Sequence, residues 1–385
     1  MSNPNQPYDV IVIGVGGMGS ATVYELAKRG KRVLGLERFD VPHDMGSSHG
    51  VNRIIRLAYY EDPSYVPLMK RAYERWRELE VDTGEQILHI TGSVDAGPED
   101  NEVFKGSYES CLEHNIPHEV LDHKELHNRF PGYQLPRGHY ALYQEEGGFL
   151  LSERCIVNHV EAAQARGAEV RAREQVLDWN ASGDHVTVRT ERGTYEAGSL
   201  VITAGAWSSH LVPGLGKRAQ AERQALGWFQ PHQPDLFSPE RFPVFNLLVD
   251  EGRYYGFPVY GVPGFKIGRY HHLDEQVNPD EVDRNVYAAD EEILRDCVAN
   301  YFPEANGATM MMKTCMFTNS PDEHFVIGTH PEHANVSFAA GFSGHGYKFC
   351  SVVGEMMSDL ALQGETPLPI ELFDPKRYLS AESAV

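Results

Sequence analysis

One segment near the start of the chain, YDVIVIGVGGMGSATVYELAKRGKRVLGLERF, restricts the possible folds more than any other. Its unbroken apolar run, residues 10–13, predicts a strand that is buried on both faces, as the strands of a parallel sheet are. A glycine-rich turn follows, then a helix over residues 20–28 and a second strand over residues 32–36. The segment therefore predicts a βαβ unit and a mixed α/β (α+β) fold with a Rossmann-type domain.

The turn itself carries the pattern GxGxxG, with glycines at Gly14, Gly16 and Gly19. One glycine makes the tight turn, one lets the backbone approach a pyrophosphate, and one permits close packing of the helix on the strand. Glu37 follows the second strand, where its carboxylate can accept hydrogen bonds from an adenosine ribose and would repel a 2′-phosphate. The unit predicts a dinucleotide site that disfavours NADP and leaves FAD and NAD open.

A second glycine-rich turn, near the other end of the chain, favours FAD. The stretch NVSFAAGFSGHGYKFCSVVGEMMSDLAL predicts a strand, a turn containing Gly344 and Gly346, and an amphipathic helix. The N-terminus of that helix can stabilise the negative charge that a flavin ring gains on reduction, whereas a simple NAD domain needs no second loop. A third strand–glycine–helix stretch, LVITAGAWSSHL, can lie beside the same nucleotide.

Composition excludes several classes of partner. The chain has 34 basic and 55 acidic residues and a formal net charge of −21, which opposes binding to nucleic acid or to an anionic membrane surface. Its five cysteines show no disulfide or zinc spacing, and His123 and His127 have the polar neighbours of a solvated helix face, so no metal is expected. The start, MSNPNQPY, resembles no signal peptide, and no segment is apolar enough to cross a membrane. We expect a cytoplasmic protein.

The rest of the chain mixes helices with short strands. Helices are predicted over residues 153–165 and 290–300, and LHITGSVDAG is expected to be one strand. HVTVRTERGTYEAGSLVITAG predicts a hairpin that leads into another buried strand. Alternating aromatic and β-branched residues over 221–269 predict an antiparallel sheet, and a further strand is expected over residues 310–317.

These elements suggest two domains, each made of segments that are apart in the sequence. Residues 1–84, 150–214 and 321–385 are expected to form an FAD-binding domain. Residues 85–149 and 215–320 are expected to form an inserted substrate domain with the antiparallel sheet.

Two arginines in the stretch GSSHGVNRIIR raise a question in so acidic a chain. Arg53 and Arg56 follow a Gly/Ser/His loop and are separated by two isoleucines, which is unlike an exposed helix face. We therefore expect at least one guanidinium to point into a cavity, where gathered cations can hold an anionic ligand.

Over essentially its whole length the chain resembles the FAD-dependent amine oxidases of the monomeric sarcosine oxidase and N-methyltryptophan oxidase type. The resemblance depends on IVIGVGGMGSA, GSSHGVNRIIRLAY, YYGFP, FKIG, TCMFTNSPDEHFVIG and AAGFSGHGYKFCSVVGE. It implies an FAD domain and a substrate domain whose sheet covers the flavin. It also implies oxidation of the C–N bond of a secondary amino acid, with oxygen reduced to hydrogen peroxide.

The resemblance also implies roles for residues around the flavin. Cys315 falls on the cysteine that attaches covalently to the flavin, although from the sequence alone it is typical of a buried core thiol. Arg53 and His49 match residues that lie against the flavin, and Lys266 matches the lysine assigned to oxygen activation.

Three further matches concern the substrate. Arg56 and Lys348 fall on the pair that holds the substrate carboxylate, and Tyr255 falls on a substrate-site tyrosine. Lys348 is also expected to bind the cofactor, where it would stabilise the reduced flavin together with Arg53. A lysine at the start of a helix, where Lys348 is expected, is unfavourable beside the positive end of the helix dipole, so a negative partner is indicated.

The pocket departs from the family pattern while the cofactor residues are retained. Tyr270 coincides with a pocket histidine, and His271 follows it. Asn246 stands in place of a methionine, Asn52 in place of a threonine and Ser48 in place of a histidine. The resemblance therefore implies the class of N-methyl amino acids as substrates and does not by itself imply sarcosine.

The resulting hypothesis is a monomeric oxidase of an N-methyl amino acid, with that amino acid and molecular oxygen as its small-molecule partners. Oxidation of a cyclic secondary amino acid, such as proline or pipecolate, is an alternative in the same pocket. An NAD-dependent dehydrogenase and a non-catalytic flavoprotein that binds an amino acid are alternatives of other classes.

Overall fold

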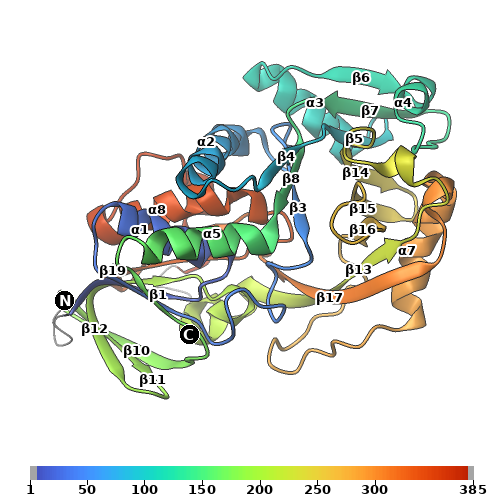
Figure 1. Ribbon diagram of the computed structural model, residues 1–385. Helices are drawn as coiled ribbons and strands as arrows, with labels where there is room; N and C mark the ends of the chain where they lie inside the picture. The colour runs from blue at the N-terminus through green and yellow to red at the C-terminus, as the bar shows by residue number, and fades with distance from the viewer. Residues whose placement is uncertain (1–6, 380–385) are drawn as a thin grey trace.

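The computed structural model describes residues 7–379, which form two large sheets and a small sheet between them (Figure 1). Helices cover one face of the first sheet, and one long helix lies behind the second (Figure 1). No helix among these residues is both long and apolar enough to cross a membrane.

The first sheet is built around four parallel strand pairings. Strand β1 pairs with β2 on one side and with β12 on the other, β2 pairs with β9, and β12 also pairs with β19. The apolar run of β1 is buried, which is why it needs no polar alternation. The strands of this sheet are β1 (Tyr8–Ile13), β2 (Val33–Leu36), β9 (Glu169–Arg171), β10 (Val176–Ser182), β11 (His185–Thr190), β12 (Thr194–Ile202), β18 (Val326–His330) and β19 (His333–Ala340).

Helices α1 (Gly17–Lys28), α2 (Val66–Thr83), α5 (Ser152–Gln164) and α8 (Cys350–Gln363) cover this sheet (Figure 1). A Cβ atom on Gly354 would lie 2.6 Å from the backbone of Ala21, so α1 and α8 pack against each other with their backbones close. This packing brings the second glycine-rich turn, which precedes α8, next to the first.

The second sheet has the order β17-β13-β16-β15-β14-β5-β7-β6. Its back face carries a buried aromatic cluster that includes Phe229, Phe245 and Phe265, and α7 (Ala288–Tyr301) packs there. The strands are β5 (Ser93–Pro98), β6 (Glu119–Asp122), β7 (His139–Gln144), β13 (Gln220–Phe229), β14 (Val244–Val249), β15 (Gly252–Phe257), β16 (Phe265–Arg269) and β17 (Thr309–Asn319). Helices α3 (Glu102–His114) and α4 (His123–Arg129) lie beside β5, β6 and β7, whereas the short α6 (Ser208–Leu211) follows β12.

The small sheet has the order β3-β8-β4, with β3 (Asn52–Ile55), β4 (Leu88–Ile90) and β8 (Gly148–Leu151). It lies between the two large sheets and carries the arginine segment (Figure 1). Every strand of the first sheet falls within the segments expected to bind FAD, and every strand of the second falls within the segments expected to bind substrate. The two-domain division remains a proposal.

The predicted βαβ unit, the hairpin and the antiparallel sheet are confirmed, and two details are wrong. LHITGSVDAG is not one strand, because the chain turns at Gly92 (φ 78°) and enters a different sheet with β5. The hairpin strand and the buried strand after it are one continuous strand, β12, whose first half pairs with β11 and whose second half pairs with β19.

Candidate active site

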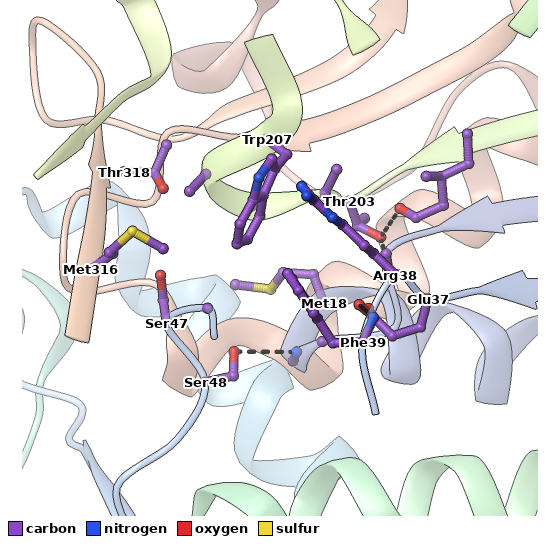
Figure 2. A pocket seen from close by; sticks show the side chains of 18 of the residues that line it. Met18, Glu37, Arg38, Phe39, Ser47, Ser48, Thr203, Trp207, Met316 and Thr318 are labelled. Carbon is purple, nitrogen blue, oxygen red and sulfur yellow. Dashed lines mark hydrogen bonds between the residues drawn. The ribbon is translucent and has the colours of Figure 1, made fainter. Parts of the chain in front are cut away.

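A cavity of about 400 Å³ runs from the βαβ unit to β17 (Figure 2). Glu37 and Arg38 border one end of it, and Met316 and Thr318 border the other (Figure 2). The volume is typical of a site for a small ligand or cofactor. The predicted cofactor residues that line the cavity are Gly14, Gly16, Glu37, Arg53, Gly344 and Gly346.

The three glycines of the first turn are required for different reasons. Gly14 has a φ of 87°, and a Cβ atom there would lie 2.6 Å from the carbonyl oxygen of Thr203. A Cβ atom on Gly19 would lie 1.7 Å from the carbonyl oxygen of Gly14, so this residue lets α1 approach β1. The nearest atom to a Cβ on Gly16 would be 3.9 Å away, and Gly16 lines the cavity. Glycine is therefore required at position 16 because a bound group must approach the backbone there, and not because other parts of the protein would clash with a side chain.

Glu37 is held by the backbone at the end of the cavity. Its Oε2 atom accepts a hydrogen bond of 2.8 Å from the Val15 N–H, and its Oε1 atom accepts one of 2.9 Å from the Phe39 N–H. A carboxylate has about four lone-pair sites, so two remain for the hydroxyls of a ribose. This geometry suits the role expected from the sequence.

The other two glycine turns also line the cavity, the second of them next to Phe317 of β17. Gly344 (φ 78°) is required there because a Cβ atom would lie 2.5 Å from the ring of Phe317. Thr203 and Trp207, from the stretch after β12, line the same cavity (Figure 2). The Thr318 hydroxyl is buried and has no hydrogen-bond partner among the described residues. A ribose-binding acid, a glycine turn at a helix N-terminus and an unpaired polar group at the far end together fit FAD.

Cys315 lies beside this far end. Its Sγ atom is 3.7 Å from Arg53 Nη2, and Arg53 is itself a lining residue. Burial raises the pKa of the Cys315 thiol, but His49 and then Arg53 outweigh burial and lower the pKa to about 6. Both ring nitrogens of His49 are buried and unpaired with any described residue. The surroundings therefore favour a thiolate, which is the nucleophilic form of cysteine.

Strand register places four of the predicted site residues, Tyr255, Asn246, Lys266 and Cys315, on one face of the second sheet. Tyr255 of β15 is directly opposite Gly268 of β16 and Asn246 of β14, and paired residues share a face. A Cβ atom on Gly268 would lie 2.5 Å from the Tyr255 ring, so that ring lies across the glycine. Lys266, two residues before Gly268, also points to this face, as does Cys315 through its pairing with Gln224. We call this face the front face.

Arg56 is 1% exposed and lies between two carboxylates. Its Nη2 atom donates a 2.8 Å hydrogen bond to Glu61, its Nε atom is 3.7 Å from Asp95, and it also donates to the carbonyl of Ala58. Burial favours a neutral Glu61, but Arg56 outweighs it and lowers the Glu61 pKa to about 2. Burial raises the pKa of Asp95. The guanidinium is therefore a fixed, buried cation.

Lys348 is a second buried cation in this region. It lies in a single 3₁₀ turn (Tyr347–Phe349) before α8, and its ammonium donates a 2.7 Å hydrogen bond to the His345 carbonyl. Burial, and then the charge of Arg56, lower its pKa to about 7. A negative ligand shared with Arg56 would restore the charge of Lys348.

Lys266 anchors the arginine segment to the second sheet. Its ammonium donates hydrogen bonds of 2.7 and 2.8 Å to the carbonyls of Gly50 and Asn52, and one of 2.8 Å to the Asn52 side chain. Burial, and then Arg53, lower its pKa well below the usual value. Asn52, one of the departures from the family pattern, is thus part of the support for Lys266. Ser48, another departure, accepts a hydrogen bond from the Gly17 N–H beside the cavity.

The remaining predicted substrate residues fall into two groups. Tyr270 is buried and Tyr255 is half-buried, and the two rings are in edge contact, with ring centres 5.2 Å apart. Asn246 donates a 2.7 Å hydrogen bond to Asp95. His271, in contrast, lies at the rim between Glu222 and Glu323, at 2.9 and 3.1 Å. These two hydrogen bonds raise its pKa to about 9.

Four residues of this region were not found from the sequence: Glu61, Asp95, Tyr60 and Arg253. The signal for Asp95 was a lone acid in a strand that is otherwise apolar or small, in SVDAG. Glu61 and Tyr60 lie just after Arg56, but only the folded segment shows that they turn back onto it. The only signal for Arg253 in the sequence was its position two residues before Tyr255, which puts the two side chains on the same face of a strand.

Comparison with known proteins agrees with this geometry. Residues 9–360 match the family described as FAD dependent oxidoreductase. The chain belongs to this family. It is 43% identical over 379 residues to the monomeric sarcosine oxidase of Streptomyces avermitilis, covering 97% of this chain and 98% of that protein. It is 34% identical over 375 residues to the N-methyl-L-tryptophan oxidase of Salmonella dublin, covering 96% and 99%. Among solved structures, NikD, an unusual amino acid oxidase essential for nikkomycin biosynthesis, matches with a TM-score of 0.84 and 25% identity over 96% and 98% of the two chains.

Membership of this FAD dependent oxidoreductase family confirms the expected fold, the FAD cofactor and the resemblance to the sarcosine oxidase type. This membership excludes the alternative that the protein is an NAD-dependent dehydrogenase. The covalent link through Cys315 and the roles of the individual residues stay predictions.

Proposed function

We propose that this protein oxidises the carbon–nitrogen bond of an N-methyl amino acid. The observation that carries the proposal is the pair of buried cations, Arg56 and Lys348. Arg53 and Tyr347, their near neighbours in the sequence, line the FAD cavity. Full-length relatives named for sarcosine and N-methyl-L-tryptophan support the substrate class. The amine loses two electrons and two protons to give an imine, water hydrolyses the imine to the demethylated amino acid and formaldehyde, and oxygen is reduced to hydrogen peroxide.

The chain's own residues bind and orient the substrate. Arg56 and Lys348 hold its carboxylate, and Tyr255 and Tyr270 bound the space around the nitrogen and its substituents. The charge of the two cations favours the neutral amine over the ammonium, which frees the nitrogen lone pair without a dedicated general base. Bound FAD would supply the two-electron acceptor.

The finer parts of the proposal concern the cofactor and the state of the protein. Cys315, flanked by His49 and Arg53, is proposed to attach the flavin, and Lys266 is proposed to assist the reaction with oxygen. We also propose that the protein acts as a monomer in the cytoplasm, in line with the relatives named monomeric sarcosine oxidase.

The proposal is tested by anaerobic mixing of the purified holoenzyme with N-methyl, cyclic and primary amino acids. N-methyl amino acids should bleach the visible absorption of the flavin, and admission of air should restore it with one hydrogen peroxide formed per turnover. Bleaching by cyclic amino acids alone would move the substrate class to proline-like compounds. Bleaching by primary amino acids alone would contradict the proposal, and bleaching by none would make the protein a binding flavoprotein.

A further inference from the structure

Arg253 is a cation that the folded protein leaves without a hydrogen bond. Its side chain is 14% exposed, and its guanidinium donates to no residue in the described range 7–379. The nearest carboxylates, Glu102 and Glu323, are 3.7 and 3.8 Å away, beyond hydrogen-bond distance. Both carboxylates are substantially exposed, so water screens them. An arginine confined in this way normally has a bidentate partner.

The guanidinium lies over the front face at the edge of the proposed substrate chamber. Arg253 and Tyr255 are two residues apart on β15, so their side chains point the same way. The guanidinium carbon is 4.0 Å from the ring centre of Tyr270, which in turn contacts Tyr255. The aromatic ring holds the cation in place but satisfies none of its N–H donors.

A shared aromatic ring relates Arg253 to the proposed carboxylate site. The guanidinium carbon of Arg56 is 4.3 Å from the ring centre of Tyr60, and that of Arg253 is 5.8 Å from the same ring centre. The Tyr60 hydroxyl is buried and has no partner among the described residues. Two cations and one unpaired hydroxyl therefore converge on a small region next to the front face.

We propose that Arg253 binds a second acidic group on the substrate, so that the preferred substrate is a dicarboxylic N-methyl amino acid such as N-methyl-aspartate or N-methyl-glutamate. The inference rests on the proposed function, because it assigns the side chain of the same substrate. Arg56 and Lys348 bind the α-carboxylate, and Arg253 binds the side-chain carboxylate with its free N–H groups. The two guanidinium carbons lie 4.3 and 5.8 Å from the same Tyr60 ring centre, so two carboxylates separated by a few carbon atoms can reach both.

The local balance of charge supports this reading. Arg56 already donates a 2.8 Å hydrogen bond to Glu61 and lies 3.7 Å from Asp95, and the side chains of these two acids are only 10% and 1% exposed. Arg253 also has two carboxylates within 4 Å, Glu102 and Glu323, but these are 67% and 45% exposed and neither accepts a hydrogen bond from it. Tyr270 and Tyr60 bring no formal charge. An anion at Arg253 therefore gains a charge-assisted hydrogen bond without displacing one.

The test compares isosteric substrates that differ in one charge. N-methyl-L-glutamate is compared with N-methyl-L-glutamine, and N-methyl-L-aspartate with N-methyl-L-asparagine, by anaerobic rapid mixing. The dependence of the flavin reduction rate on concentration separates the dissociation constant from the limiting rate. We expect the acid to be preferred by about tenfold or more in at least one pair, mainly through the dissociation constant. Arg253→Gln should remove this preference, and Arg253→Lys should keep part of it.

Arg129→Gln is the matched control, because Arg129 also stacks on a tyrosine, Tyr143, at 4.2 Å, but at the far edge of the same sheet. It should leave the preference unchanged. The inference would be overturned if the wild-type protein bound the acid and the amide with the same dissociation constant. It would also be overturned if Arg253→Gln weakened the binding of acid and amide to the same extent, because Arg253 would then have a structural role only. Sarcosine separates the two levels: if it reduces the flavin and neither acid does, only this inference fails. If no N-methyl compound does, the proposed function fails with it.

Discussion

The nucleotide cleft and the front face of the second sheet are assembled from the chain in different ways. The recognisable part of the cleft, the first glycine turn and Glu37, comes from one continuous segment, Tyr8 to Glu37, and Glu37 is held there by backbone N–H groups. Residues of the other two glycine turns and of β17 complete the lining. The front face gathers side chains from strands as distant as β5 and β17, and register alone makes them neighbours. The first kind of site can be recognised from local sequence, whereas the second depends on tertiary pairing.

The two regions also differ in how their charges are satisfied. Glu37 in the cleft is held by two backbone N–H groups and keeps capacity for a ligand. Beside the front face, Arg56, Glu61 and Asp95 are buried charges that depend on one another. Because buried charges are costly even when paired, a cluster of this kind is better explained by function than by stability.

The largest effect is expected from Gly19→Ala in the cleft. The added Cβ atom would lie 1.7 Å from a backbone oxygen, so α1 must move away from β1. We expect loss of bound FAD and destabilisation by more than about 4 kcal/mol, measured by flavin content and by denaturant unfolding. Gly16→Ala is the matched comparison, because its Cβ would meet only the cavity. It should unfold like the wild-type apoprotein and bind FAD about tenfold more weakly. If the two substitutions destabilised the protein equally, Gly19 would not be needed for helix packing and Gly16 for ligand space, as the account requires.

Arg56→Gln should affect both stability and substrate binding. It leaves Glu61 and Asp95 without their cation, which costs about 3–5 kcal/mol of unfolding free energy. It should also lower kcat/KM for the N-methyl substrate by about two orders of magnitude or more, since a charged contact to the carboxylate is lost. Steady-state kinetics and denaturant unfolding measure the two effects. Arg56→Lys, which keeps the charge, should recover more stability than kcat/KM. If the glutamine variant retained wild-type kinetics, Arg56 would not be the carboxylate site.

Cys315→Ala tests the cysteine that links the two regions. If its thiolate attaches the flavin, acid precipitation of the wild-type protein should leave the colour with the polypeptide, and the variant should release it to the supernatant. Cys297→Ala is a suitable control, because Cys297 is a buried thiol behind the second sheet whose pKa is raised by burial. The control should retain the colour. Wild-type protein that releases its flavin under acid would refute the link without affecting FAD binding.

The smallest effect is expected at the rim of the front face. The pKa of His271 is raised to about 9 from 6.5, so its contribution to stability is complete below about pH 6.5 and is lost as the pH rises through 9. The free energy of unfolding should therefore fall over this interval, and less steeply in His271→Asn. Urea titrations at several pH values measure the slopes. Identical slopes in the two proteins would show that the Glu222 and Glu323 contacts do not hold a proton on His271.

Much of the fold could be predicted from local pattern. The βαβ unit, the antiparallel sheet and the helices near residues 153–165 and 290–300 follow from periodicity and glycine placement, and the structure confirms them. LHITGSVDAG was expected to be one strand because its apolar residues continue through Gly92. Only the tertiary turn at that glycine separates β4 from β5.

The candidate site could be predicted only in part. Motif and resemblance named Arg56 and Lys348, but not the carboxylates that flank Arg56, since Asp95 reaches it from a different sheet. Lys266 was expected near the flavin, and its three hydrogen bonds to Gly50 and Asn52 could not be inferred from spacing. The set of residues that share the front face could be identified only from the register of the strands in the folded protein.

The most direct measurement is an experimental structure of the holoenzyme with a carboxylate inhibitor in place of the substrate. The account predicts the flavin along the cleft from Glu37 to Thr318, and the inhibitor's carboxylate within hydrogen-bond distance of both Arg56 and Lys348, over the front face of the second sheet. A carboxylate bound elsewhere, with Arg56 and Lys348 both free of it, would contradict the account.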